Sequence, residues 1–521
     1  MDSASTLPPQ VSIGQPSWRI NRAQLTVGLV VLALAVRCAG LTLRPLWLDE
    51  AFTGWFTGQS WHYLWTVLPT YEAHPPFYYS LLKLWRLAFG GEALALRSFS
   101  VLFSVATIPV IIAAAFEHER LTPTGRPLLA AGVAAFLAAC SPMLVILGQE
   151  ARSYPLLTFA FAVAVLGLLR LMVQFRDGKP GDWPSWLLLG VGTEATLWSH
   201  SLGLLYSLCL AIALAPSWLK SPITSGRLGR GLAVAAAVAL LYLPCLLLVM
   251  GRAHDWGTNW LAWEPWMLLQ LLVIYSVPIE AMTIASAVAA LAMLLLIKRG
   301  LASAIAARSW NADRALLLLW LGPPVLAAIV STVFVPIFLA RTLVGTLVPA
   351  YLMIGAAVAR SDSPRERALL TAAMVITLLV TAFQVATRLP AERWDLAAAY
   401  LRRNVAAQDQ VWIYPSDSAI PLDRLGPRPG VQRLLPAPFP TMGVTGPIRA
   451  GWPAMVSLTP EQARRLAEDP AVKDVRVIWL VTRQSGIFDP DNDMPNALAR
   501  VRKPGQMQEW GYINARPYYR R

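Results

Sequence analysis

RPLWLDEAFTGWFTGQSWHYLWTVLPTYEAHPPFYY, residues 44–79, follows the first long apolar run of this chain. The stretch combines acidic and histidine side chains with many aromatic residues and several proline and glycine breaks. Its two adjacent acids, Asp49 and Glu50, lie at the point where the apolar run ends. Since ionisable groups at a membrane boundary usually have a function, the first question is whether the chain spans a membrane.

The composition indicates a membrane protein. Of 521 residues, 56% are hydrophobic and only 14% are charged, and the mean hydropathy is +0.50. Soluble domains contain about 25% charged residues. Apolar runs of about 20 residues, enough to cross a hydrocarbon core as helices, recur along the chain, and the alternation typical of a transmembrane barrel is missing. We therefore predict a polytopic α-helical membrane protein.

The apolar runs predict about eleven spans of membrane-crossing length. Lysine and arginine gather in alternate short loops, which predicts a cytoplasmic N-terminal tail over residues 1–23 and an outward-facing loop over residues 44–97. Residues 266–279 are apolar but short and predict a juxtamembrane or re-entrant helix, and residues 75–89 are ambiguous. The expected spans are 24–43, 98–116, 127–147, 155–174, 184–199, 201–217, 231–250, 281–297, 315–333, 342–359 and 368–386.

The net charge of +14 does not indicate a nucleic-acid partner, because the basic residues lie in the inward loops and in the tail. The four cysteines all lie inside apolar runs, which excludes a disulfide framework and a CxxC metal site. The expected environment is a lipid bilayer.

The composition changes after residue 389. Residues 24–389 form the expected transmembrane domain, and residues 390–521 are polar and rich in proline, with no run that could span a membrane. Residues 393–405 and 458–470 predict helices, and residues 411–415 and 475–481 predict buried strands. The odd number of spans places this small α/β domain outside the cytoplasm, where we expect it to position an acceptor.

The pair Asp49-Glu50 has a structural and a functional interpretation. The acids could simply cap the helix that begins near Ala51. The functional interpretation is favoured by the aromatic residues around them and by a second element in the same loop, Glu72-Ala73-His74-Pro75-Pro76.

These residues carry a family resemblance. The WLDE motif (47–50), the carboxylate-x-HPP-x-YY element (72–79) and Arg97 at the loop end resemble the GT-C superfamily of membrane glycosyltransferases. The similarity is to protein O-mannosyltransferases, aminoarabinose transferases and lipopolysaccharide-core galacturonosyltransferases (glycosyltransferase family 39). Three further segments resemble that family, namely GQEARSYPLL (148–157), FLARTLVGTLVPAY (338–351) and RWDLAAAYLRRNVAAQDQVWIYP (393–415).

The resemblance implies a GT-C fold and an inverting transfer of a sugar from a polyprenyl-phosphate carrier to an acceptor hydroxyl on the outer face. Because a lipid phosphate is already a good leaving group, such a reaction needs one carboxylate as general base and cations for the phosphate. A glycosidase would instead need two carboxyl groups flanking the bond. Asp49 is the expected general base. Glu50, assigned with it to the catalytic site, either orients Asp49 or pairs with an arginine.

The remaining candidate residues are expected to bind substrate. Glu72 would bind sugar hydroxyls or share a proton with Asp49, or is an ordinary turn acid. His74 would bind phosphate or satisfy the turn before two prolines. Arginine suits phosphate because its planar fork donates paired bonds. The phosphate candidates are Arg152, Arg341 and Arg97, the last of which could merely snorkel at a helix end; Tyr154 would bond phosphate or pack at the interface.

We predict no cofactor and no metal, as the resemblance implies, although Asp49, Glu50 and Glu72 could hold a divalent cation. The expected partners are a polyprenyl-phosphate-linked sugar donor and a glycolipid, glycan or protein acceptor, in a bacterial inner membrane. The alternatives are a lipid-linked glycan flippase or transporter, a polymerase or ligase, and a structural role. A transporter would place its charges in the middle of interrupted spans, whereas these charges lie in outward loops and at span ends.

Overall fold

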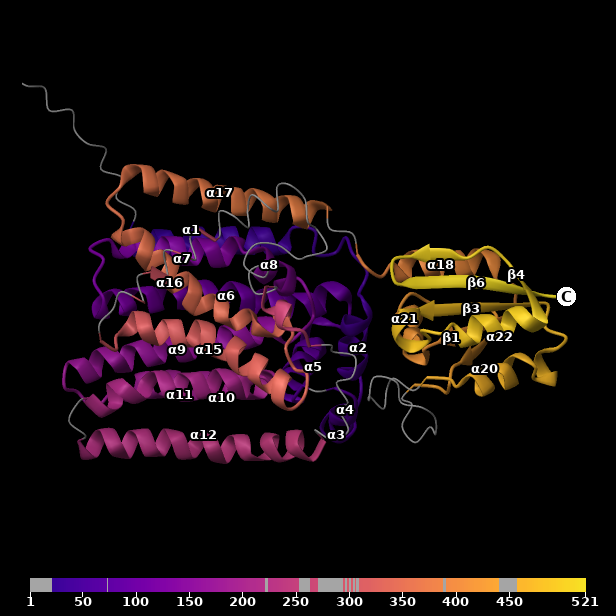
Figure 1. Cartoon of the computed structure of the whole chain (residues 1–521), viewed down its shortest axis with the longest axis horizontal. Coiled ribbons are helices and arrows are strands. Elements are labelled where there is room, and N and C mark those ends of the chain that lie inside the picture. The colour runs from indigo at the N-terminus through magenta and orange to yellow at the C-terminus, as the bar shows by residue number, and fades with distance from the viewer. Residues whose placement is uncertain are drawn as a thin grey trace, which may run out of the picture.

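The computed structural model describes residues 21–72, 74–220, 224–252, 263–269, 309–387, 390–439 and 457–521, with isolated positions between 294 and 305. Long helices form a bundle, and the last part of the chain forms a separate domain at one end of it (Figure 1). The bundle helices are α1 (Arg22–Cys38), α6 (Ala93–Leu121), α7 (Pro127–Cys140), α8 (Pro142–Gly148), α9 (Tyr154–Arg176), α10 (Trp183–Ser199), α11 (Gly203–Lys220), α12 (Ser225–Arg252), α15 (Ala312–Val333), α16 (Leu347–Arg360) and α17 (Pro364–Thr387).

The predicted fold class, a polytopic helical membrane protein with a small C-terminal sheet domain, is confirmed. Within the described residues, seven helices are long and apolar enough to cross a membrane, or eight if the bent pair α7–α8 is one span. Each expected span coincides with a helix, or with the bent pair α7–α8, except 281–297. Most of that span, of residues 266–279 and of the tail 1–23 lies outside the described residues. The total number of spans therefore stays a prediction.

Helix α9 lies at the centre of the bundle. An apolar 18-residue stretch of α9 is 83% buried, whereas the corresponding stretch of α12 is only 11% buried and faces the surroundings. Small residues let α9 and α10 pack closely: a Cβ atom on Gly167 would lie 2.4 Å from the backbone nitrogen of Leu189. Small residues at helix contacts are typical of packing in membranes, where helices gain little from apolar burial alone.

The predicted span 127–147 is broken into α7 and α8, which meet at 54°. Pro142 cannot continue the helical hydrogen bonds of α7. The carbonyls freed at the break are satisfied by the buried Arg37 of α1, which donates to the carbonyls of Ala139 (2.8 Å) and Ala138 (3.1 Å). The bend directs α8 into the connection that carries Arg152.

The loop over residues 44–97 forms four short helices between the bundle and the C-terminal domain: α2 (Leu48–Phe56), α3 (Trp61–Thr66), α4 (Leu68–Tyr71) and α5 (Phe77–Phe89) (Figure 1). The ambiguous segment 75–89 lies mainly in α5, whose 13 residues are too few to span a membrane. One face of α5 buries Tyr78, Tyr79 and Leu82, while Leu87 and Phe89 are exposed. This pattern is typical of a helix lying in the membrane interface.

The C-terminal domain contains a six-stranded sheet with the order β2-β1-β3-β6-β4, and β5 also pairs with β6. Strand β1 is parallel to β2 and β3, whereas β6 is antiparallel to β3, β4 and β5. The strands are β1 (Gln410–Tyr414), β2 (Val431–Leu434), β3 (Val477–Arg483), β4 (Arg502–Pro504), β5 (Gln508–Trp510) and β6 (Ile513–Arg520). The helices are α18 (Trp394–Asn404), α19 (Ala419–Asp423), α20 (Pro460–Ala467), α21 (Ser485–Phe488) and α22 (Asp493–Val501).

The expected elements of this domain all form. The helix expected at 393–405 is α18, the strands expected at 411–415 and 475–481 are β1 and β3, and the helix expected at 458–470 is α20. Thr459 begins α20 with a capping box to Gln462.

Candidate active site

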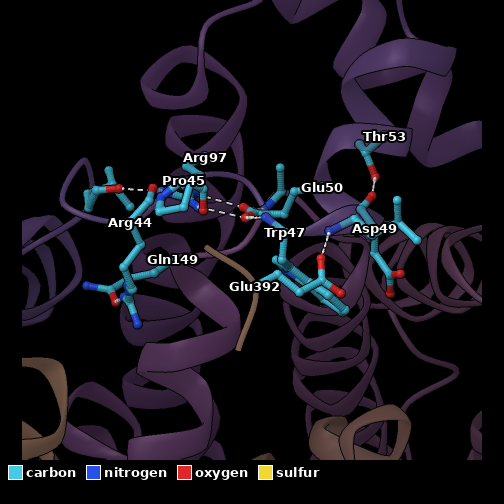
Figure 2. Close-up of polar contacts among 12 residues, drawn as sticks. Arg44, Pro45, Trp47, Asp49, Glu50, Thr53, Arg97, Gln149 and Glu392 are labelled. Carbon is cyan, nitrogen blue, oxygen red and sulfur yellow. Dashed lines mark hydrogen bonds and ion pairs between the residues drawn. The ribbon is translucent and has the colours of Figure 1, made fainter. Parts of the chain in front are cut away.

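The two adjacent acids of α2 have opposite environments (Figure 2). The Glu50 carboxylate is fully buried and accepts two bonds from Arg97, Nε to Oε1 at 2.8 Å and Nη2 to Oε2 at 2.6 Å. It also accepts the backbone N–H of Ala151 at 2.9 Å. Of the two roles that the sequence left open for Glu50, the geometry supports pairing with an arginine.

Arg97 has a different task from the substrate contact expected of it. Besides its two bonds to Glu50, its guanidinium donates to the backbone carbonyls of Leu41, Arg44 and Pro45. A guanidinium has five N–H donors, and these contacts occupy all five. The Arg97–Glu50 pair therefore holds the loop after α1 against α2 and the connection after α8, and leaves no donor for a phosphate.

The Asp49 carboxylate is open to the site. Its Oδ2 lies 3.9 Å from Nη2 of Arg341, and the two side chains are 26% and 34% exposed. Arg341 lies in the 3₁₀ helix η3 (Ala340–Thr346) that leads into α16, and its guanidinium lies over the Trp47 ring, 5.7 Å from the centroid. Thr53 donates to the backbone carbonyl of Asp49 and not to its carboxylate (Figure 2).

Arg152 and Glu72 extend the site. Nη1 of Arg152 lies 3.5 Å from Oε2 of Glu72, and it donates to the Tyr79 hydroxyl at 3.4 Å. Burial alone would lower the pKa of Arg152, but Tyr79, Glu72 and Asp49 together raise it well above its ordinary value. Arg152 therefore keeps its positive charge, which also interacts electrostatically with Asp49.

His74 joins this cluster, with Nε2 3.5 Å from Oε1 of Glu72. Its ring lies 4.2 Å, centroid to centroid, from that of His200 in the turn between α10 and α11. Burial, followed by the charges of Arg152 and Arg341, lowers the pKa of His74 well below its ordinary value. His74 is neutral at physiological pH.

The sequence analysis did not select His200 as a site residue. Its Nδ1 accepts the backbone N–H of Leu202 at 3.0 Å, so the ring proton is on Nε2. Burial, and then His74, Arg152 and Arg341, lower the pKa of His200 well below its ordinary value. Its position in a short turn between two apolar runs was the available signal, but nothing in the sequence indicates which turn packs against the first loop.

Several buried donors in the residues of this site have no partner in the described part of the chain, among them Nε of Arg152, Nε of Arg341 and Nε2 of His200. A buried donor left unpaired costs about 1–3 kcal/mol, so such groups in a cluster indicate a ligand that accepts hydrogen bonds. The positive charges of the arginines favour an anion.

Tyr154 begins α9 and is buried, with its ring 6.0 Å from that of His200. It lines a small, mostly apolar pocket together with Leu147 and Val344. Among the described residues, no group of three His, Cys, Asp or Glu side chains could hold a metal ion. Independence from a metal stays a prediction.

Comparison with known proteins gives the fold. No family model and no curated protein matches the sequence. The structure is similar to that of ArnT from Cupriavidus metallidurans in the apo state, with a TM-score of 0.59 and 14% identity over 95% of this chain and 98% of that one. For ArnT from the same organism bound to undecaprenyl phosphate, the TM-score is 0.59 and the identity 13%, over 96% of this chain and 98% of that one. For the oligosaccharyltransferase of Archaeoglobus fulgidus in complex with Zn and sulfate, the TM-score is 0.54 and the identity 13%, over 95% of this chain and 73% of that one.

Proposed function

We propose that this chain, which has the GT-C fold, is an inverting glycosyltransferase that uses a polyprenyl-phosphate sugar as donor. The observation that carries the proposal is the 3.9 Å approach of the partly exposed Asp49 carboxylate to Arg341, beside the unpaired buried donors of Arg152 and His200. A proton acceptor and an anion site lie side by side, as transfer from a phosphate leaving group requires.

In the proposed reaction, the acceptor hydroxyl attacks the anomeric carbon of the donor sugar. The bond between that carbon and the phosphate oxygen breaks as the new glycosidic bond forms, which inverts the anomeric centre. Asp49 takes the hydroxyl proton, and the phosphate keeps the electron pair of the broken bond. Arg341 and Arg152 stabilise this charge, and Glu72 binds sugar hydroxyls.

The fold neighbours support a lipid-linked donor, since ArnT has been solved bound to undecaprenyl phosphate. The acceptor is a glycolipid such as lipopolysaccharide, a glycan, or a protein. We propose that the enzyme lies in a bacterial inner membrane with the site facing outward. Basic residues such as Arg120, Arg176 and Lys220 at the opposite helix ends support this orientation.

A lipid-linked glycan flippase or transporter and a polymerase are the alternatives. The proposal is tested with detergent-purified protein and a panel of polyprenyl-phosphate sugars labelled in the sugar, incubated with lipid, glycan and peptide acceptors. We expect one equivalent of polyprenyl phosphate to be released for each sugar transferred. Movement of the intact donor across proteoliposomes without bond cleavage would contradict the proposal and favour the transporter.

A further inference from the structure

A carboxylate of the C-terminal domain reaches the helix that carries Asp49. Oε2 of Glu392 accepts the backbone N–H of Leu48, the first residue of α2, at 2.8 Å (Figure 2). The same carboxylate accepts Nε1 of Trp394 at 2.8 Å and Nε of Arg483 at 2.6 Å. Glu392 is 1% exposed, so its geometry is fixed by the domain to which it belongs.

This contact replaces a cap that α2 lacks. The residue before the helix is Trp47, whose side chain has no oxygen and makes no capping bond. The first N–H groups of a helix have no partner within it and need one elsewhere. Glu392 supplies that partner, and its negative charge is also favourable at a helix N-terminus. The residue held in this way is Leu48, and Asp49 follows it directly in the chain.

Further contacts join the same two parts. Arg424 donates from Nη2 to the backbone carbonyl of Gly91 at 2.6 Å. Phe439 packs edge-on against Phe52 and Trp55 of α2, with centroids 5.1 and 5.3 Å away. The C-terminal domain thus contacts α2 at its start and along its aromatic face.

We infer that Glu392 is a positioning residue for Asp49, so that the C-terminal domain takes part in the chemical step and not only in binding the acceptor. The inference rests on the proposed function for its kinetic consequence. If the bond between Glu392 and the Leu48 N–H is lost, the first turn of α2 is free to shift, and with it the carboxylate of Asp49 relative to Arg341. A misplacement of about 1 Å can lower a rate about 100-fold.

Two pairs of variants test the contact. Leu48→Pro removes the N–H that Glu392 accepts, yet proline is well tolerated at the first position of a helix; Leu48→Ala keeps the N–H and loses the side chain. Glu392→Gln removes the charge of the carboxylate, and Asp395→Asn alters the neighbouring, partly exposed ion pair with Arg393.

We expect kcat to fall roughly 10- to 100-fold in Leu48→Pro and in Glu392→Gln, with KM for the donor unchanged, and to change less than about 3-fold in Leu48→Ala and Asp395→Asn. The losses in the Leu48→Pro/Glu392→Gln double variant should not multiply, since the first removes the bond between Glu392 and the Leu48 N–H and the second weakens the same bond by removing the charge of its acceptor. Multiplying losses, or equal losses in Leu48→Ala and Leu48→Pro, would overturn the inference.

Hydrogen exchange of the full-length protein separates this inference from the proposed function, because it needs no substrate. Glu392→Gln should speed exchange across residues 48–56 while leaving the amides of β1 and β3 protected. Unchanged exchange in α2 would overturn the positioning role even if transfer occurs. Faster exchange in a protein that transfers no sugar would instead keep the contact and remove the proposed reaction. Loss of protection in β1 and β3 would show that Glu392 only stabilises its own domain, which also overturns the inference.

Discussion

Asp49 and Glu50 are neighbours in sequence, but they differ in burial and in partners. Glu50 is fully buried in a complete set of bonds with Arg97, whereas Asp49 is partly exposed beside Arg341. Sequence reasoning selected both acids, because an acidic pair at a membrane boundary is unusual. It could not divide their tasks, because which side of α2 faces Arg97 depends on packing between segments that are distant in sequence.

Glu50→Gln and Asp49→Asn should therefore affect stability differently. Removing one partner of a buried ion pair leaves an unpaired charge and costs about 3–5 kcal/mol. We expect Glu50→Gln to lower the Tm of the detergent-solubilised protein strongly and Asp49→Asn to leave it nearly unchanged. Equal melting temperatures for the two variants would contradict the structural role of Glu50.

Arg341 should bind the phosphate of the lipid carrier. Arg341→Gln should weaken binding of undecaprenyl phosphate about 10- to 100-fold, since a hydrogen bond to a charged group contributes about 1.5–3 kcal/mol. Equilibrium binding to the purified protein measures this. Arg120→Gln is the matched control, because Arg120 is an exposed arginine at the far end of α6; similar losses in both variants would argue against a specific phosphate site.

His200 should contribute a donor to the same site. His200→Ala should weaken undecaprenyl phosphate binding, while His200→Gln, which keeps an N–H donor, should retain most of it. Because the pKa of His200 lies well below its ordinary value, the ratio of wild-type to His200→Ala affinity should stay constant between about pH 7 and pH 8. A ratio that titrates in this range would contradict a neutral imidazole donor.

At the scale of elements, hydropathy and charge predicted most helices of the bundle because lipid imposes helices on apolar runs. The break between α7 and α8 was not predicted, although Pro142 was visible. A proline can kink a span or end it, and the outcome depends on whether the freed carbonyls find donors. Here Arg37 of α1 provides them.

In the C-terminal domain, buried apolar runs revealed β1 and β3, whereas β6 was not predicted. Only its first five residues alternate between buried and partly exposed, and it contains Pro517, Arg516 and Arg520. Such a sequence becomes a strand because β3, β4 and β5 pair with it on both sides, and that information is not local.

Asp417, in the loop after β1, should make the stability of the protein depend on pH. Burial, opposed by Arg483, raises the pKa of Asp417 from 3.8 to about 6. A carboxyl with a raised folded-state pKa contributes stability that is present below the unfolded value and is lost as pH rises through about 6. Asp417→Asn should therefore stabilise the protein, by at most about 3 kcal/mol at about pH 8, and by less at about pH 5.

Thermal denaturation at the two pH values measures this difference. The exposed Asp395 is the control, because its pKa is lowered by its bond to Arg393 and its replacement by asparagine should not stabilise the protein at either pH. A larger gain for Asp417→Asn at the lower pH would contradict a raised pKa for the buried Asp417 carboxyl.

At the scale of the whole molecule, the candidate site is assembled from segments that are far apart in the chain. The first loop supplies Asp49 and Glu72, the connection after α8 supplies Arg152, and η3 supplies Arg341. The sequence predicted these residues because each follows an expected span on the side of the membrane that is predicted to face outward, a side assigned from the positive charge of the loops on the other side. It did not indicate that the C-terminal domain contacts α2 through Glu392, since no motif marks an acid that caps a distant helix.

The central claim is that Asp49 takes the proton of the acceptor hydroxyl. The most direct test is the single-turnover rate of sugar transfer from a saturating polyprenyl-phosphate donor, measured for the wild type and for Asp49→Asn alongside equilibrium binding of the donor. We predict a fall of about 10²- to 10⁴-fold in the rate, with donor binding retained. A full transfer rate in Asp49→Asn would contradict the account.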